Sequence, residues 1–345
     1  MVTALDPAPA TLQAARALEE QGRFREAIEV ATEANRIAPD TRTEKFLVRV
    51  RHESFGKVPH PAPAAPPAPI PTLGPEPGEA LPSIRPDELT PERLQDGLAR
   101  HGCLWVKGLV PPARVDALVA GIDRALAGCD AFLAGAKPVD TAPWFVPFKP
   151  VPSEEGYRIG GRGFMREAGG VWTAESPRML FELMGLIDEL GIGDLVTAHL
   201  GERPALSANK CTLRRVPVRS STDWHQDGAF LGQDIRSVNL WIALSHCGDD
   251  APGMDIVPRR IDHVVPTGTD GAIFDWAVAP SVVADAAQGT PVIRPVFEPG
   301  DALLFDHLFL HRTAAEPTMA RERYAMETWM FAPSDYPKGQ IPITY

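Results

Sequence analysis

Three side chains in this sequence have the types and spacing needed to hold one metal ion. His225 and Asp227 are separated by a single residue, so both side chains fall on the same side of a strand or tight turn. His311 lies much later in the chain and completes a set of two imidazoles and one carboxylate. That set is typical of non-haem iron(II) sites, which keep positions open for a chelating oxo-acid and for dioxygen. His307 competes for the third place, and we favour His311 because it lies deeper in an apolar run.

A chelating oxo-acid also needs a cation for its distal carboxylate. Arginine suits this role because its planar fork can donate two parallel hydrogen bonds to a carboxylate. Arg321 and Arg323 both stand just before a strand predicted over residues 324–331. Continuing the strand alternation backward places Arg323 on the same face as the small Ala325, which leaves room for a ligand. We therefore favour Arg323, with Arg321 as the alternative.

The elements around these residues predict a domain with helices first and strands later. Thr90, followed by proline and glutamate, indicates a helix start, and this helix should end near Gly102. A strand over 104–106 and a helix over 112–126 follow. From about residue 207, short runs rich in Val, Ile, Leu, Phe and Trp alternate with turn clusters, as in antiparallel sandwiches or barrels. The order indicates an α+β domain with helices flanking a β-barrel.

The chain divides into three predicted parts. Residues 1–57 hold two helical runs on either side of Gly22, which predicts a helical hairpin similar to one tetratricopeptide unit. Residues 58–82 are rich in proline and alanine, which predicts an extended or disordered linker that lets the two ends move independently. Residues 83–345 form the main domain. The hairpin either packs on this domain or self-associates, or it docks a protein partner.

Composition narrows the classes of function. The formal net charge of −11 and the lack of a basic patch argue against a nucleic-acid partner. The four scattered cysteines form no zinc or disulfide pattern, and neither a signal peptide nor a long apolar stretch is visible. We therefore expect a cytoplasmic protein that acts on a small molecule and does not bind membranes.

The ordered set of these motifs resembles the phytanoyl-CoA dioxygenase family of iron(II)- and 2-oxoglutarate-dependent oxygenases. The resemblance implies a double-stranded β-helix (jelly-roll, cupin-like) core with flanking helices. It implies Fe(II), 2-oxoglutarate and O2 as cofactors, with Arg323, Thr313, Gln226 and Trp241 around the 2-oxoglutarate; Lys210 or Arg214 is a further polar candidate. The matching segments are residues 224–227, 239–244, 300–305, 310–313 and 323–325.

The expected activity is hydroxylation of an unactivated carbon in a small organic or acyl substrate. Residues 253–260 depart from the Pro-Gly-Ser-His turn common in the family, so the substrate pocket is not carried over. Candidate walls are residues 144–172, where Arg158 and Arg162 could meet an anionic group, and residues 268–288, with Phe274 and Trp276. The alternatives are a catalytically inactive scaffold, or a metal-binding jelly roll that is not an oxygenase.

Overall fold

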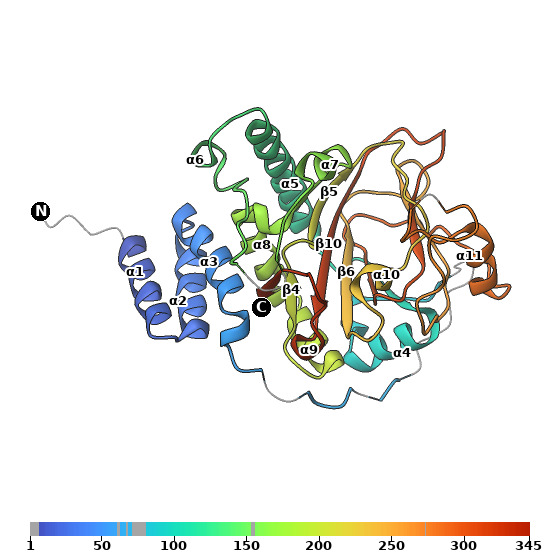
Figure 1. The fold of residues 1–345 in the computed structure, drawn as a ribbon, viewed down its shortest axis with the longest axis horizontal. Helices are drawn as coiled ribbons and strands as arrows, with labels where there is room; N and C mark the ends of the chain where they lie inside the picture. The colour runs from blue at the N-terminus through green and yellow to red at the C-terminus, as the bar shows by residue number, and fades with distance from the viewer. Residues whose placement is uncertain (1–6, 61–62, 67, 71–80, 153–155, 273) are drawn as a thin grey trace, which may run out of the picture.

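The computed structural model describes residues 7–60, 63–66, 68–70, 81–152, 156–272 and 274–345. Three helices at the N-terminal end lie beside a larger body of strands and helices (Figure 1). The fold is mixed α+β, as the order of the sequence patterns predicts. In the described part of the chain, no helix is both long enough and apolar enough to cross a membrane. The four cysteines are free and buried.

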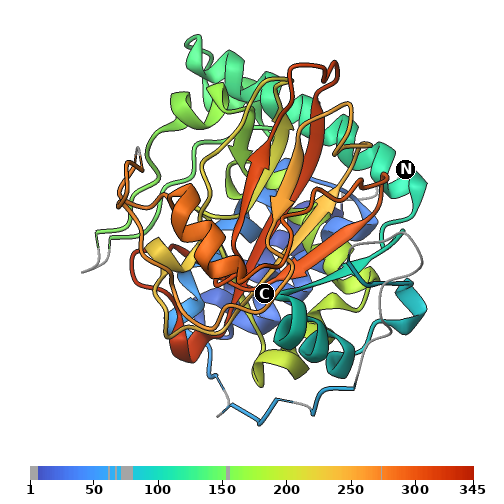
Figure 2. The same cartoon turned by 90° about the vertical axis from the view of Figure 1, so that its right-hand side faces the viewer.

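The main sheet carries the strand that holds Arg323. Strand β10 (Arg323–Phe331) lies between β6 (Ser237–Ala243) on one side and β4 (Ala205–Ser207) and β5 (Thr212–Val216) on the other, all antiparallel to it. These strands lie side by side in the centre of the molecule (Figure 2). The remaining strands of this sheet are β1 (Ser83–Ile84), β2 (Cys103–Val106), β3 (Gly170–Trp172), β8 (Ala302–Phe305) and β11 (Pro342–Thr344).

A second, smaller sheet faces the first. Strand β7 (Gly253–Ile256) pairs antiparallel with β9 (His311–Ala314), and His225 joins β9 through a bridge to His311. Arg323 reaches from β10 to this sheet, where it donates hydrogen bonds to the main-chain oxygen of Gly253 and to the Thr313 hydroxyl. The space between the sheets therefore contains His311, Thr313 and Arg323, which are three of the residues expected to bind iron or 2-oxoglutarate.

The helices follow local signals closely. Helix α4 (Pro91–His101) begins where the Thr90 hydroxyl accepts a hydrogen bond from the Arg93 amide, and it ends at Gly102, whose φ of +75° favours glycine. Helix α5 (Pro112–Leu133) runs beyond its predicted end at residue 126, because the buried Cys129 keeps the helix against the core. The other helices are α6 (Pro138–Thr141), α7 (Arg162–Glu167), α8 (Pro177–Glu189), α9 (Ile192–Leu200), α10 (Gly228–Leu231) and α11 (Pro280–Ala287).

The N-terminal part contains three helices rather than a hairpin. Helices α1 (Pro7–Glu20) and α2 (Phe24–Ile37) pack together, and α3 (Thr41–Glu53) follows after a short turn. Phe46, Leu47 and Val50 of α3 complete an apolar cluster with α1 and α2. A pair of helices cannot bury its apolar face by itself, which explains why α3 packs against α1 and α2.

The prediction that the N-terminal part moves independently is wrong, because α3 is docked on the main domain. Glu44, fully buried, pairs with Arg178 of α8. His52 is buried and contacts two distant segments: its Nδ1 lies 2.8 Å from the Pro342 oxygen, and its Nε2 accepts the Val151 amide at 3.0 Å. These contacts use polar groups on both sides, so separation would leave several of them unpaired.

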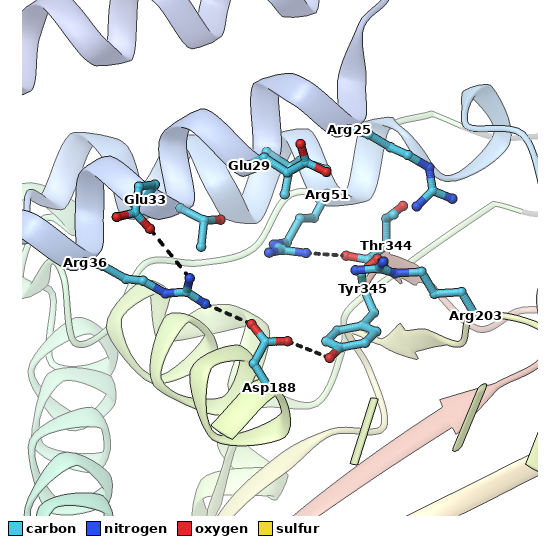
Figure 3. A pocket seen from close by; sticks show the side chains of 11 residues that line it. Arg25, Glu29, Glu33, Arg36, Arg51, Asp188, Arg203, Thr344 and Tyr345 are labelled. Atoms are coloured by element: carbon cyan, nitrogen blue, oxygen red, sulfur yellow. Dashed lines mark hydrogen bonds and ion pairs between the residues drawn. The ribbon is translucent and has the colours of Figure 1, made fainter. Parts of the chain in front are cut away.

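The C-terminal residues meet α2 and α3 at a cavity of about 320 Å³ (Figure 3). Arg51 donates a hydrogen bond to the Thr344 main-chain oxygen at 2.9 Å. Asp188 of α8 joins Arg36 of α2, at 2.9 Å, to the Tyr345 hydroxyl, at 2.6 Å. This cavity is thus built from contacts that hold the N-terminal helices in place, and none of the expected iron ligands lines it.

The predicted linker contacts the main domain, and two described main-chain hydrogen bonds belong to this contact. The Ala64 amide donates to the Gly201 oxygen at 2.8 Å, and the Ile70 amide lies 3.4 Å from the Glu92 oxygen. A side chain at Gly201 would lie 2.1 Å from the Ala64 oxygen, so this approach requires glycine. Residues 71–80, within the predicted linker, lie outside the described residues.

Replacing His52 with alanine should lower the free energy of unfolding by about 2 kcal/mol, because the Val151 amide loses its acceptor in a buried place. Urea denaturation measures this change. His60→Ala is the matched control, since His60 is exposed and contacts only nearby residues of its own segment. An equal loss of stability in both variants would contradict the docking role of His52.

Candidate metal centre

His225, Asp227 and His311 come together at the edge of the small sheet. The main chains of His225 and His311 exchange two hydrogen bonds, of 3.0 and 3.1 Å, which brings their rings to a centroid distance of 4.5 Å. Asp227 follows at the start of α10, where Gly228 allows the chain to pass close to His307 and Val264. One ligand atom from each of the three residues lies within 4.8 Å of the others.

Both imidazoles are oriented by main-chain oxygens. The Nδ1 of His225 lies 2.9 Å from the Asp223 oxygen, and the Nδ1 of His311 lies 3.0 Å from the Phe309 oxygen. These contacts require the proton on Nδ1, so Nε2 carries the free lone pair of a neutral ring. Burial, together with the neighbouring His225, lowers the pKa of His311 to about 4. A neutral imidazole is the form that binds a metal.

The Asp227 carboxylate is buried beside one cation. Lys210 Nζ lies 3.6 Å from Asp227 Oδ1, and the His311 Nε2 lies 4.0 Å from Oδ2. The same Lys210 ammonium sits over the Phe230 ring, 3.5 Å from its centroid. Burial lowers the pKa of Lys210, although Asp227 opposes this effect. The carboxylate therefore keeps an oxygen directed at the two imidazoles, as a ligand set requires.

The structure separates the two histidines that competed for the third place. His307 is buried, but its Nδ1 lies 2.9 Å from the Ser237 hydroxyl and its Nε2 lies 2.9 Å from the Gln233 oxygen. Both ring nitrogens are thus used within the protein. His311 alone of the two has a free Nε2 facing Asp227.

Arg323 is a buried cation without an acidic partner. Its exposed fraction is 1%, and among the described residues no carboxylate lies within ion-pair distance of it. Its Nη1 donates to the oxygens of Pro252 and Gly253, at 3.2 and 2.9 Å, while its Nε has no partner. Arg321, by contrast, is exposed and pairs with Asp250. A buried, uncompensated guanidinium is costly unless an anion joins it.

Two of the three other expected cosubstrate residues lie next to Arg323. The Thr313 hydroxyl accepts a hydrogen bond from Arg323 Nη2 at 3.4 Å, and Thr313 shares one face of β9 with His311. The Trp241 ring lies 5.5 Å from the guanidinium, and its buried Nε1 has no partner. Two orphaned donors, from Trp241 and Arg323, fit an anionic ligand between the sheets.

The Gln226 side chain makes its hydrogen bonds within the protein. Its amide nitrogen donates to the oxygens of His263 and Leu308, at 3.1 and 2.5 Å, and its oxygen accepts the Val265 amide at 2.7 Å. The side chain is fully buried among these groups. It ties the loop after β7 to the segment with His225, and its side-chain oxygen and nitrogen are both hydrogen-bonded within the protein.

The sequence patterns missed or misjudged some neighbours of the three candidate ligands, His225, Asp227 and His311 (the triad). Phe230 and Glu327 were not singled out, although Glu327 lies on the same alternation as Arg323 and could have been found from it. Arg162 is not available to a substrate, since it pairs with the buried Glu175 at 2.6 Å. Trp276 does lie at the site, with its ring edge-on to His225 at a centroid distance of 5.7 Å.

Comparisons with known proteins bear on the family and the fold. The family described as Phytanoyl-CoA dioxygenase (PhyH) matches residues 98–323. EctD from S. alaskensis, solved with 2-oxoglutarate and 5-hydroxyectoine, is 16% identical with a TM-score of 0.52, covering 80% of this chain and 87% of EctD. EctD with bound Fe is 16% identical with a TM-score of 0.50, covering 70% and 76%. AviO1 from Streptomyces viridochromogenes Tue57 is 18% identical with a TM-score of 0.45, covering 71% and 96%. Among curated protein sequences, none matches.

Fold and family define the class. The chain is an oxygenase of the iron- and 2-oxoglutarate-dependent type, because the family pattern spans well over half of its length. It belongs to the phytanoyl-CoA dioxygenase family. Its cofactors are accordingly Fe(II), 2-oxoglutarate and O2. The free imidazole nitrogens, the buried carboxylate and the unpartnered guanidinium described above fit this set.

Proposed function

We propose that this protein hydroxylates an unactivated carbon of a small organic substrate, with Fe(II) held by His225, Asp227 and His311. Arg323 binds the distal carboxylate of 2-oxoglutarate, and Thr313 and Trp241 line the same place. The observation that carries the proposal is the buried Arg323 guanidinium, which has no carboxylate partner among the described residues and contacts the strand that holds His311.

Each residue has a definable task. His225 and His311 present neutral Nε2 atoms whose direction is fixed by main-chain oxygens, which holds the ligand geometry without further ordering. Trp276 lies edge-on to the His225 ring and places an apolar surface beside this ligand. Bound iron and 2-oxoglutarate supply the oxidation: 2-oxoglutarate becomes succinate and CO2, and the substrate gains one oxygen atom of O2. The protein positions the reactants, and Asp227 occupies the ligand place that a halide would need.

Anaerobic titration tests this proposal. The Fe(II)-loaded protein should develop a weak visible charge-transfer band when 2-oxoglutarate is added, because a chelated oxo-acid and a six-coordinate iron produce one. Succinate, a dicarboxylate that lacks the 2-oxo group and so cannot chelate as an oxo-acid, is the control and should produce none. Absence of the band at saturating iron and 2-oxoglutarate would favour a metal-binding or scaffolding protein instead.

A further inference from the structure

The face of the main sheet that carries Arg323 has more cationic than anionic side chains near the triad. Cross-strand register places Arg214 of β5 opposite Ala325 of β10, two residues from Arg323, so both arginines point to the same side. Arg214 donates to the Ala168 oxygen at 3.3 Å, and its Nε is buried without a partner. Among the described residues, no carboxylate pairs with it. Arg214 is thus a second cation of this face with hydrogen-bonding capacity to spare.

Counting charges shows what the site lacks. Lys210, Arg214 and Arg323 are cations, whereas Asp227 and Glu327 are the carboxylates facing them. The Glu327 carboxylate accepts a hydrogen bond from Thr212 at 2.9 Å and makes no ion pair among the described residues. Under the proposed function, Fe(II) and the dianion of 2-oxoglutarate cancel each other. One positive charge then stays uncompensated, which a single anionic group on the substrate would balance.

Aromatic rings lie beside all three expected iron ligands, and those next to His311, Phe305 and Phe309, are buried. Trp276 contacts His225 edge-on, and Phe274 stacks on Trp276 at 5.2 Å with an interplanar angle of 4°. Phe230 stands beside Asp227 under the Lys210 ammonium. Phe274 and Phe230 are 50% and 40% exposed, although large apolar side chains usually avoid water. Exposed aromatic rings next to a reactive centre are suited to receive a flat apolar group.

We infer that the substrate is an organic acid with a flat apolar body, held by Lys210 and Arg214 at its anionic group and by Trp276, Phe274 and Phe230 along its body. The inference rests on the proposed function and names the substrate class of that same site. Lys210 is free for this role once Asp227 binds the metal, because their separation of 3.6 Å is already longer than a close hydrogen bond. The aromatic pair comes from residues 268–288, a segment outside the matching family motifs.

Three probes separate charge from shape: 3-phenylpropionate, 3-phenylpropylamine and propionate. Each is titrated calorimetrically into the anaerobic protein loaded with Fe(II) and 2-oxoglutarate, in which the visible band is recorded first. 3-Phenylpropionate should bind at least about tenfold more tightly than the amine, which meets like charges, and than propionate, which lacks the ring. Equal binding of acid and amine, or no binding of 3-phenylpropionate at millimolar concentration, would overturn the inference.

Variants locate the contacts. Lys210→Met should weaken the binding of 3-phenylpropionate by at least about tenfold. Lys210→Arg should keep most of the affinity, since the charge is kept. Trp276→Ala should remove the preference for 3-phenylpropionate over propionate. Lys57→Met is the matched control, because Lys57 also lies over an aromatic ring, that of Phe24, but in the N-terminal part. Unchanged binding in Lys210→Met would contradict the assignment.

The experiment distinguishes a failure of the proposed function from a failure of the inferred substrate class. If the visible band does not form, the proposed function fails before any probe is added. If the band forms and the probes do not discriminate by charge or ring, only the substrate class is wrong. A band that forms normally in Lys210→Met, with weakened binding of 3-phenylpropionate, assigns Lys210 to the substrate and not to the 2-oxoglutarate.

Discussion

Asp227→Ala should eliminate iron-dependent turnover of 2-oxoglutarate. The substitution removes the carboxylate of the ligand set and leaves two imidazoles that share one short bridge. It also leaves the Lys210 ammonium without its nearest acid. The ammonium then repels a divalent cation. Loss of metal assistance of about 4 kcal/mol corresponds to a decrease of roughly a thousandfold in rate. Succinate formation measures the rate, and competition with a chromogenic chelator measures the iron affinity.

The chain offers a matched control for this substitution. His246, Asp249 and Asp250 form a second group of possible ligand atoms, but it is largely exposed and its histidine is already engaged by Asp249 and Glu298. Asp249→Ala should therefore leave iron affinity and turnover unchanged. If Asp249→Ala lost iron while Asp227→Ala kept it, the metal would belong to the exposed group. His311→Ala should resemble Asp227→Ala.

Local patterns were sufficient to predict that His225, Asp227 and His311 lie together, and their role as iron ligands stays a prediction. The spacing of His225 and Asp227 indicated that they share one side of a strand or turn, and the structure places them at a turn where α10 begins. The same argument placed Arg323 on the face of Ala325, and the register of β10 with β5 agrees with it. The ends of α4 were also readable, since a threonine cap and a terminal glycine act within a few residues.

The errors concern contacts between segments far apart in the sequence. A proline-rich linker predicts separation, and nothing in the composition of α3 reveals that His52 reaches Pro342 and Val151. The family resemblance implied that the Gln226 side chain lines the 2-oxoglutarate pocket. Its amide instead satisfies main-chain groups at residues 263, 265 and 308, which only the folded chain brings near. Burial and partner choice depend on tertiary packing, and a single sequence does not specify them.

Arg323→Met should raise the KM for 2-oxoglutarate by about 100-fold and change iron affinity little. The fork of Arg323 has donors to spare after its contacts with Pro252, Gly253 and Thr313, and a charge-assisted pair with a carboxylate in such a buried place contributes about 3 kcal/mol. Methionine fills similar volume without charge. The measurement is the initial rate of succinate formation against 2-oxoglutarate concentration, beside the anaerobic visible band.

Arg321→Met separates this effect from a general loss of positive charge. Arg321 stands two residues earlier, but it is exposed and pairs with Asp250, so its removal should leave the KM for 2-oxoglutarate within about twofold. Arg323→Lys should fall between wild type and Arg323→Met, because an ammonium keeps the charge and loses the planar fork. An effect of Arg321→Met as large as that of Arg323→Met would show that the carboxylate of 2-oxoglutarate is bound by the general positive potential of this region and not by one guanidinium. An effect confined to residue 323 would show that a single buried guanidinium, which contacts Thr313 on the strand that carries His311, binds the carboxylate of 2-oxoglutarate.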